Sequence, residues 1–198
     1  MMHIISIKGH ALGKDSLRNL SSRFPAPNDV ENMMLRLHQE DDRTAAIVGA
    51  SLVESSLERV LVSSFEASTS DLNQRLFENR GPLSDFNSKI LVAQAFNVFS
   101  ERMANDIQRI RRIRNCFAHA RLPVTFEEAA VAKEVSELAA VMAVRSTEHH
   151  YTPEQPFPYH SHKTSYGLSC YITMVLLHDQ HLKKGGDPFM STPRRDAI

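Results

Sequence analysis

Apolar and polar residues follow one another with a helical period through most of this chain, which predicts mainly α-helix. The clearest pattern lies within residues 43–64, where apolar and small side chains share one helical face. That face carries Ala46, Gly49, Ala50, Val53, Leu57, Val60 and Leu61. Because the first members of this stripe are small, we expect the helix to cross a neighbouring helix closely.

Candidate N-terminal caps precede several other amphipathic stretches. They are Asn28 with Glu31, Ser84, and a capping box formed by Thr125 and Glu128. Further helices are predicted over residues 71–77, 85–100, 103–120 and 165–181. We therefore predict an all-α bundle of five or six helices, with its core between residues 28 and 145.

Changes in composition along the chain suggest four parts. Proline and histidine become frequent after Arg145, and glycine, proline and mixed charges follow Lys183. The predicted parts are an N-terminal extension (1–27), the helical bundle (28–145), a His/Pro-rich arm with a C-terminal docking helix (146–182), and a flexible tail (183–198). The apolar positions of the docking helix predict that it packs back on the bundle or on a partner chain.

Charge and cysteine content narrow the class of protein. The 198 residues include 23 basic and 23 acidic side chains, which argues against a protein that binds any nucleic acid through a general positive charge. Two cysteines and no secretory signal favour the reducing cytoplasm, and no apolar run approaches the length of a membrane span. We expect a cytoplasmic protein that does not enter a membrane.

The stretch Ile113–His119, near the end of a basic amphipathic helix, carries the chemistry that stands out in this chain. Arg114 can bind a phosphate through two hydrogen bonds, and His119 can exchange a proton near neutral pH. Asn115 can orient the imidazole or bind a phosphate oxygen. These three are the candidate catalytic residues for cleaving RNA through its 2′-hydroxyl, a reaction that needs no metal or other cofactor.

Basic neighbours on the same helix are candidates for binding RNA or phosphate. They are Arg109, Arg111 and Arg112. The alternative interpretation is that these arginines form an ordinary solvated helix face. A histidine in the last turn also complements the helix dipole without any catalytic role.

The spacing of Arg114 and His119 bears on the oligomeric state. Five residues separate them, so on one helix their side chains point about 140° apart. Two copies of the helix packed across a twofold axis could bring Arg114 of one chain near His119 of the other. The spacing therefore favours a homodimer with a composite site, with local unwinding around Ala118 as the alternative.

The sequence from Ile113 to His119 resembles the Arg-x(4–6)-His signature of HEPN domains. Those domains are helical bundles, and many are dimeric, metal-independent ribonucleases. The resemblance implies an endoribonuclease that acts on RNA and is paired with an antitoxin, with Arg114 and His119 at the dimer interface.

Three segments in order also resemble the mannitol-operon repressor family of the same helical superfamily: residues 42–58, 81–86 and 110–119. This second resemblance covers roughly residues 40–122 and implies a regulator without a recognised DNA-reading element. The two resemblances leave two functions open, namely an RNA-directed endoribonuclease and a non-enzymatic transcriptional regulator that acts through a regulatory partner protein.

Other candidate sites are weaker. A histidine-rich stretch contains His149, His150, His160 and His162. A metal site would need a third or fourth fixed ligand, so solvated loop histidines are the default and we expect no metal. Cys116 is either a redox-sensitive thiol or a small residue near the core. Glu54 is expected on a solvated helix face, with pairing to a signature arginine as the alternative.

Overall fold

The computed structural model describes residues 24–78, 80–139 and 161–190, and within them it contains seven α-helices, one 3-10 helix and no strand. The predicted all-α bundle is confirmed. The elements are α2 (Pro27–Arg36), η1 (Leu37–Gln39), α3 (Asp42–Ser64), α4 (Ser70–Phe77), α5 (Phe86–Ala95), α6 (Glu101–His119), α7 (Ala129–Ser136) and α9 (His162–Lys183).

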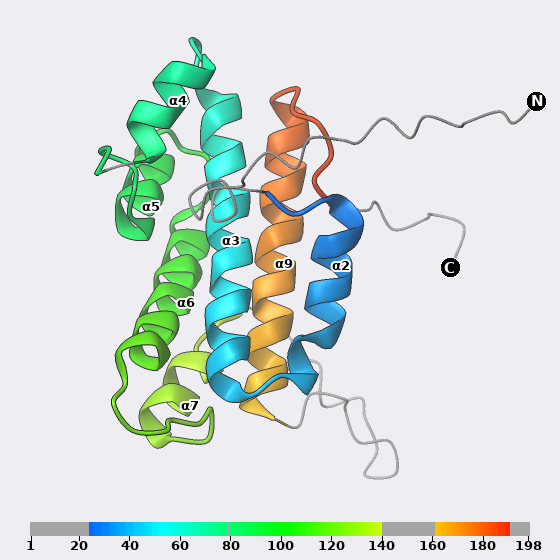
Figure 1. Cartoon of the computed structure of the whole chain (residues 1–198), viewed down its shortest axis with the longest axis vertical. Helices are drawn as coiled ribbons and strands as arrows, with labels where there is room; N and C mark the ends of the chain where they lie inside the picture. Colours follow the sequence, from blue (N-terminus) through cyan, green and yellow to red (C-terminus); the bar gives the residue numbers. More distant parts are fainter. Residues whose placement is uncertain (1–23, 79, 140–160, 191–198) are drawn as a thin grey trace, which may run out of the picture.

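Helix α3 is the centre of the bundle, and it contacts α5 and α6 as well as α9. Figure 1 shows α3 between the green α5–α6 pair and the orange α9. The whole stripe predicted on α3 is buried. No helix of the described residues combines the length and the apolar character that a membrane span requires.

The small residues of α3 allow α9 to approach closely, as predicted. A Cβ on Gly49 would lie 3.2 Å from a ring carbon of Tyr166 and 3.3 Å from the sulfur of Cys170. The Tyr166 hydroxyl donates a hydrogen bond to the backbone oxygen of Ala46 at 2.9 Å. The Tyr166 ring also lies 5.1 Å from Phe126, which in turn lies 4.8 Å from Phe117 of α6. An aromatic row thus joins α6 to α9.

Helix α9 is therefore part of the core, which extends beyond the expected limit at residue 145. Its fully buried residues include Tyr166, Cys170, Met174 and Leu177. It packs on α3 of the bundle, which is one of the two positions considered in the sequence analysis. Phe189 and Met190 are also buried, at 2% and 5% exposure, although the sequence predicted a loose tail there.

Several predicted caps are wrong by a few residues. Asp85, and not Ser84, caps α5 by accepting a hydrogen bond from the Ser88 amide at 3.0 Å. Helix α2 begins after Ala26 with Pro27 in its first turn and has no side-chain cap, so Asn28 lies inside the helix. Proline suits this position because it has no amide hydrogen to satisfy.

The loops after α5 and α6 also differ from the prediction. Helix α5 ends at Ala95 and not near residue 100, because Asn97 adopts a left-handed φ of 51°. The Thr125–Glu128 capping box does not form, and α7 begins after Glu128 without a side-chain cap. Instead, the amide of Phe126 donates to Asp42 at 2.9 Å, which fixes the loop so that the Phe126 ring enters the core.

Candidate functional site

Helix α6 carries the candidate catalytic residues Arg114, Asn115 and His119. Ser100 caps its N-terminus by accepting a hydrogen bond from the Met103 amide, and His119 is its last residue. Its inward face is apolar and buried, with Ala104, Ile107, Ile110, Ile113 and Phe117. Burial of this stripe fixes the rotation of the helix, so the polar residues between these positions face α3, α5, α7 or solvent.

Arg114 lies next to α3 and binds a carboxylate there. Its guanidinium donates to Glu54 at 3.1 Å and to the side-chain oxygen of its neighbour Asn115 at 3.0 Å. The pairing of Glu54 with a signature arginine, the alternative in the sequence analysis, is therefore correct. The Arg114 side chain is 28% exposed and the Glu54 side chain 18%, so the pair is only partly open to water.

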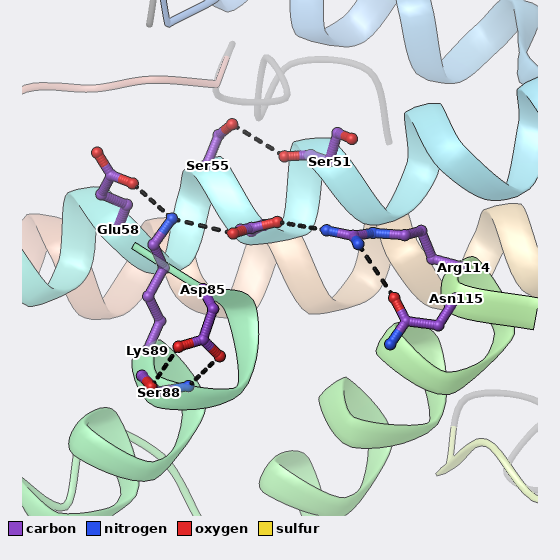
Figure 2. A network of polar contacts seen from close by, with 9 residues as sticks. Ser51, Ser55, Glu58, Asp85, Ser88, Lys89, Arg114 and Asn115 are labelled. Carbon is purple, nitrogen blue, oxygen red and sulfur yellow. Dashed lines mark hydrogen bonds and ion pairs between the residues drawn. The ribbon is translucent and has the colours of Figure 1, made fainter. Parts of the chain in front are cut away.

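Lys89 of α5 holds the other side of the same carboxylate. Its ammonium donates to Glu54 at 3.0 Å and lies 2.8 Å from a carboxylate oxygen of Glu58. Figure 2 shows Lys89 and Arg114 on the same side of α3, spaced along the helix, with Glu58 beyond the lysine. Two cations and two carboxylates thus alternate along α3. We call Glu54, Glu58, Lys89 and Arg114 the α3 charge cluster.

The α3 charge cluster is balanced and keeps Lys89 charged. Burial alone would lower the pKa of Lys89, but the charges and hydrogen bonds of Glu54 and Glu58 outweigh burial and raise the pKa above its usual value of 10.5. The stabilisation that this ammonium provides is complete below the usual value and is lost only as the pH rises through the higher value of the folded protein. The charge of Lys89 is thus insensitive to pH around neutrality.

The three predicted phosphate-binding arginines are also engaged within the chain. Arg109 and Arg112 both bind Glu134 of α7, at 2.9 and 2.8 Å, and Arg109 also binds Glu137. Arg111 donates to Gln108 of its own helix at 2.9 Å. Glu134 of α7 and Glu137, directly after that helix, therefore balance much of the positive charge that the sequence suggested for this face.

His119 is exposed at the C-terminal end of α6, away from the α3 charge cluster. Arg43, at the start of α3, donates to the backbone oxygen of the adjacent Ala120 at 2.6 Å and so fixes the end of α6. The interactions of the described residues join Arg114 to Asn115 but not to His119. One chain therefore brings together two of the three candidate catalytic residues.

Lys89 is a member of this cluster that the sequence analysis missed. It is 5% exposed as a whole residue. A signal was present, because Phe86, Lys89, Ile90 and Ala93 lie on the buried face of α5 with helical spacing. A charged residue at a core position predicts a buried carboxylate partner.

The weaker candidate sites have the following positions. His162 is the first residue of α9 and lies 2.8 Å from Glu127, whereas His149, His150 and His160 fall outside the described residues. Cys116 is exposed. Within residues 24–78, 80–139 and 161–190, no three histidine, cysteine or acidic residues are grouped as a metal ion would require.

Comparison with known proteins identifies a similar fold. No family model matches the sequence, and no curated protein is significantly similar to it. A solved structure, the X-ray structure of the MtlR–HPr complex from Escherichia coli, is similar over 75% of this chain and 97% of its own, with a TM-score of 0.58 and 15% identity. MtlR is the mannitol operon repressor. The described bundle therefore has an MtlR-like fold.

Proposed function

We propose that this protein is a non-enzymatic regulator that acts through contacts with a partner protein. The observation that carries the proposal is the shared fold with MtlR, which was crystallised in a complex with HPr. The resemblance of residues 42–58, 81–86 and 110–119 to the mannitol-operon repressor family points in the same direction. A protein of the HPr type is accordingly the first partner to test.

The α3 charge cluster supports a structural role for the signature arginine. A phosphate at Arg114 would have to displace Glu54, and the second carboxylate of the cluster, on Glu58, would repel it. Arg109 and Arg112 are likewise both bound to Glu134 of α7. Through these contacts Arg109, Arg112 and Arg114 link α6 to α7 and α3.

A second candidate function is the metal-independent endoribonuclease implied by the HEPN resemblance. The observation that favours it is the exposure of His119, together with the 28% exposure of the Arg114 side chain on the same helix. In a homodimer, Arg114 and Asn115 of one chain would hold a phosphate near His119 of the other. Arg109, Arg111 and Arg112 would then attract the RNA backbone after release from their present partners.

Two assays separate these functions. HPr purified from the same organism is titrated into the full-length protein in a calorimeter, and we expect saturable binding. Labelled RNA is incubated in EDTA with the wild type, with His119→Ala and, as a matched exposed histidine, with His38→Ala. We expect no cleavage by any of them.

Cleavage of RNA to a cyclic phosphate by the wild type and His38→Ala, but not by His119→Ala, would replace the regulator proposal with the nuclease. Absence of HPr binding would remove the proposed partner. Because His119 is exposed, its substitution should leave the thermal midpoint of unfolding unchanged, so a lost activity would not reflect a lost fold.

A further inference from the structure

Two histidines of α9 are buried against a segment that folds back after that helix. His178 and His181 are 6% and 9% exposed. The Phe189 ring covers both, with its centroid 4.9 Å from the His178 ring and 5.4 Å from the His181 ring. Phe189 also lies 5.3 Å from the guanidinium carbon of Arg59 on α3.

The backbone after α9 is built for this return. Gly185 has a left-handed φ of 80°, and the amides of Gly185 and Gly186 bond back to the last turn of α9 at 2.9 and 3.0 Å. A Cβ on Gly186 would lie 2.1 Å from Nε2 of His181, so any side chain at this position would have to displace that ring. Residues 184–190 therefore pack directly on the histidine pair, and we call them the return segment.

The surroundings of both imidazoles favour the neutral form. Nε2 of His178 is buried and has no hydrogen-bond partner among the described residues. A protonated ring would have to bury a second N–H donor and a charge at that place. Nδ1 of His181 lies 3.1 Å from the hydroxyl of Ser63, which can serve either tautomer without a charge.

Burial and nearby charges both shift the pKa values of the two histidines. Burial is the largest influence and lowers the pKa of His178 and of His181, and the net shift of each pKa is downward. The charge of His181 lowers the pKa of His178 further, whereas Asp179 raises it. The charge of Arg59 lowers the pKa of His181, whereas Asp187 and backbone hydrogen bonds raise it.

We propose that His178 and His181 form a pH-sensitive latch, which holds the return segment on the bundle near neutral pH and releases it when both rings are protonated. Protonation would place two like charges one helical turn apart, beside the guanidinium of Arg59. Release of the return segment lets water reach both rings and relieves this repulsion. It also exposes Phe189 and Met190 of the return segment, and the apolar surface that they cover becomes available.

The direction of the pH effect follows from linkage. A histidine whose pKa is lower in the closed state binds its proton more readily when the latch is open. The closed state is therefore fully favoured above the ordinary histidine value of 6.5 and loses stability as the pH falls toward the lower values of the closed state. Between those limits, each histidine changes the equilibrium constant between the docked and the released return segment by up to about tenfold per pH unit. The pair therefore changes it by up to about a hundredfold per pH unit.

The test follows the Met190 methyl group by NMR in the full chain with labelled methionine methyls, from about pH 8 to about pH 5, where histidines titrate. The signal is assigned with Met190→Leu. We expect it to move from the shifted position of a buried methyl to that of free methionine as the pH falls. His178→Phe, which keeps a buried ring but takes no proton, should lower the midpoint and halve the pH sensitivity.

His38→Gln, at an exposed histidine, should leave the Met190 transition unchanged. A Met190 signal that keeps its neutral-pH position down to about pH 5 overturns the latch. The latch is also overturned if the Met190 transition of His178→Phe has the same midpoint and slope as that of the wild type. If His178→Phe does not fold, His181→Gln replaces it, and the same loss of half the pH sensitivity is required.

Discussion

Replacing Lys89 by methionine would remove the charge that separates Glu54 from Glu58. Methionine fills nearly the same volume, so the change in energy comes mainly from electrostatics and not from a cavity. The two carboxylates lie four residues apart on α3 and would face each other with Arg114 alone to balance them. Removing one partner of a buried ion pair costs about 3–5 kcal/mol.

The exposure of each side chain sets where in that range the cost falls. Lys89 is 7% exposed, but its carboxylate partners are 18% and 23% exposed and can draw water when the ammonium is gone. We therefore expect Lys89→Met to destabilise the protein by about 3 kcal/mol, the lower end of the range. Arg114 is 28% exposed, and Glu54 keeps Lys89 when it is lost, so Arg114→Met should cost only about 1 kcal/mol.

Urea denaturation followed by circular dichroism at 222 nm measures both free energies of unfolding. For a chain of this length the costs correspond to falls of about 6–12 °C in Tm for Lys89→Met and about 2–4 °C for Arg114→Met. Lys133→Met, at an exposed lysine of α7, is the matched control and should change little. Equal losses for Lys89→Met and Arg114→Met, or a loss below about 1 kcal/mol for Lys89→Met, would refute the argument that Lys89 holds this cluster together.

Two further substitutions test the packing and the capping of the bundle. Gly49→Leu should cost about 1–3 kcal/mol in urea denaturation, because even an added Cβ would lie within 3.3 Å of Tyr166 and Cys170. No loss of stability would mean that α3 and α9 separate easily. Asp85→Ala should destabilise the protein by about 1 kcal/mol by removing the cap of α5, whereas Ser84→Ala should cost much less. A larger loss of stability for Ser84→Ala would show that Ser84 is the cap.

The sequence predicted the helices well and their ends less well, for a physical reason. The buried stripe of α3 repeats over 23 residues, so several positions agree on one face. A cap depends on one side chain, and Ser84 and Asp85 are adjacent residues with the same capping chemistry. Burial of Leu83 and Phe86 helps to fix this turn, and such tertiary contacts are not visible in a local pattern.

The candidate site was predicted only in part. The local motif identified Arg114 and Asn115, whose hydrogen bond joins neighbouring residues. The partners of Arg114 are remote in sequence: Glu54 lies 60 positions away, and Lys89 lies 35 positions from Glu54. Only the packing of α5 and α6 on α3 brings these charges together. The local spacing therefore suggested that the Arg114 guanidinium is free, whereas in the fold it is bound to Glu54.

The packing of α9 on α3 has a consequence for synthesis of the protein on the ribosome. The hydrogen bond from Tyr166 to Ala46 spans 120 positions, so α3 is made long before the helix that covers it. At about 5–20 residues per second, the small and apolar face of α3 waits roughly 6–24 seconds for α9. During that interval this apolar face of α3 is exposed, so the nascent chain can bind chaperones or misassemble with other nascent chains.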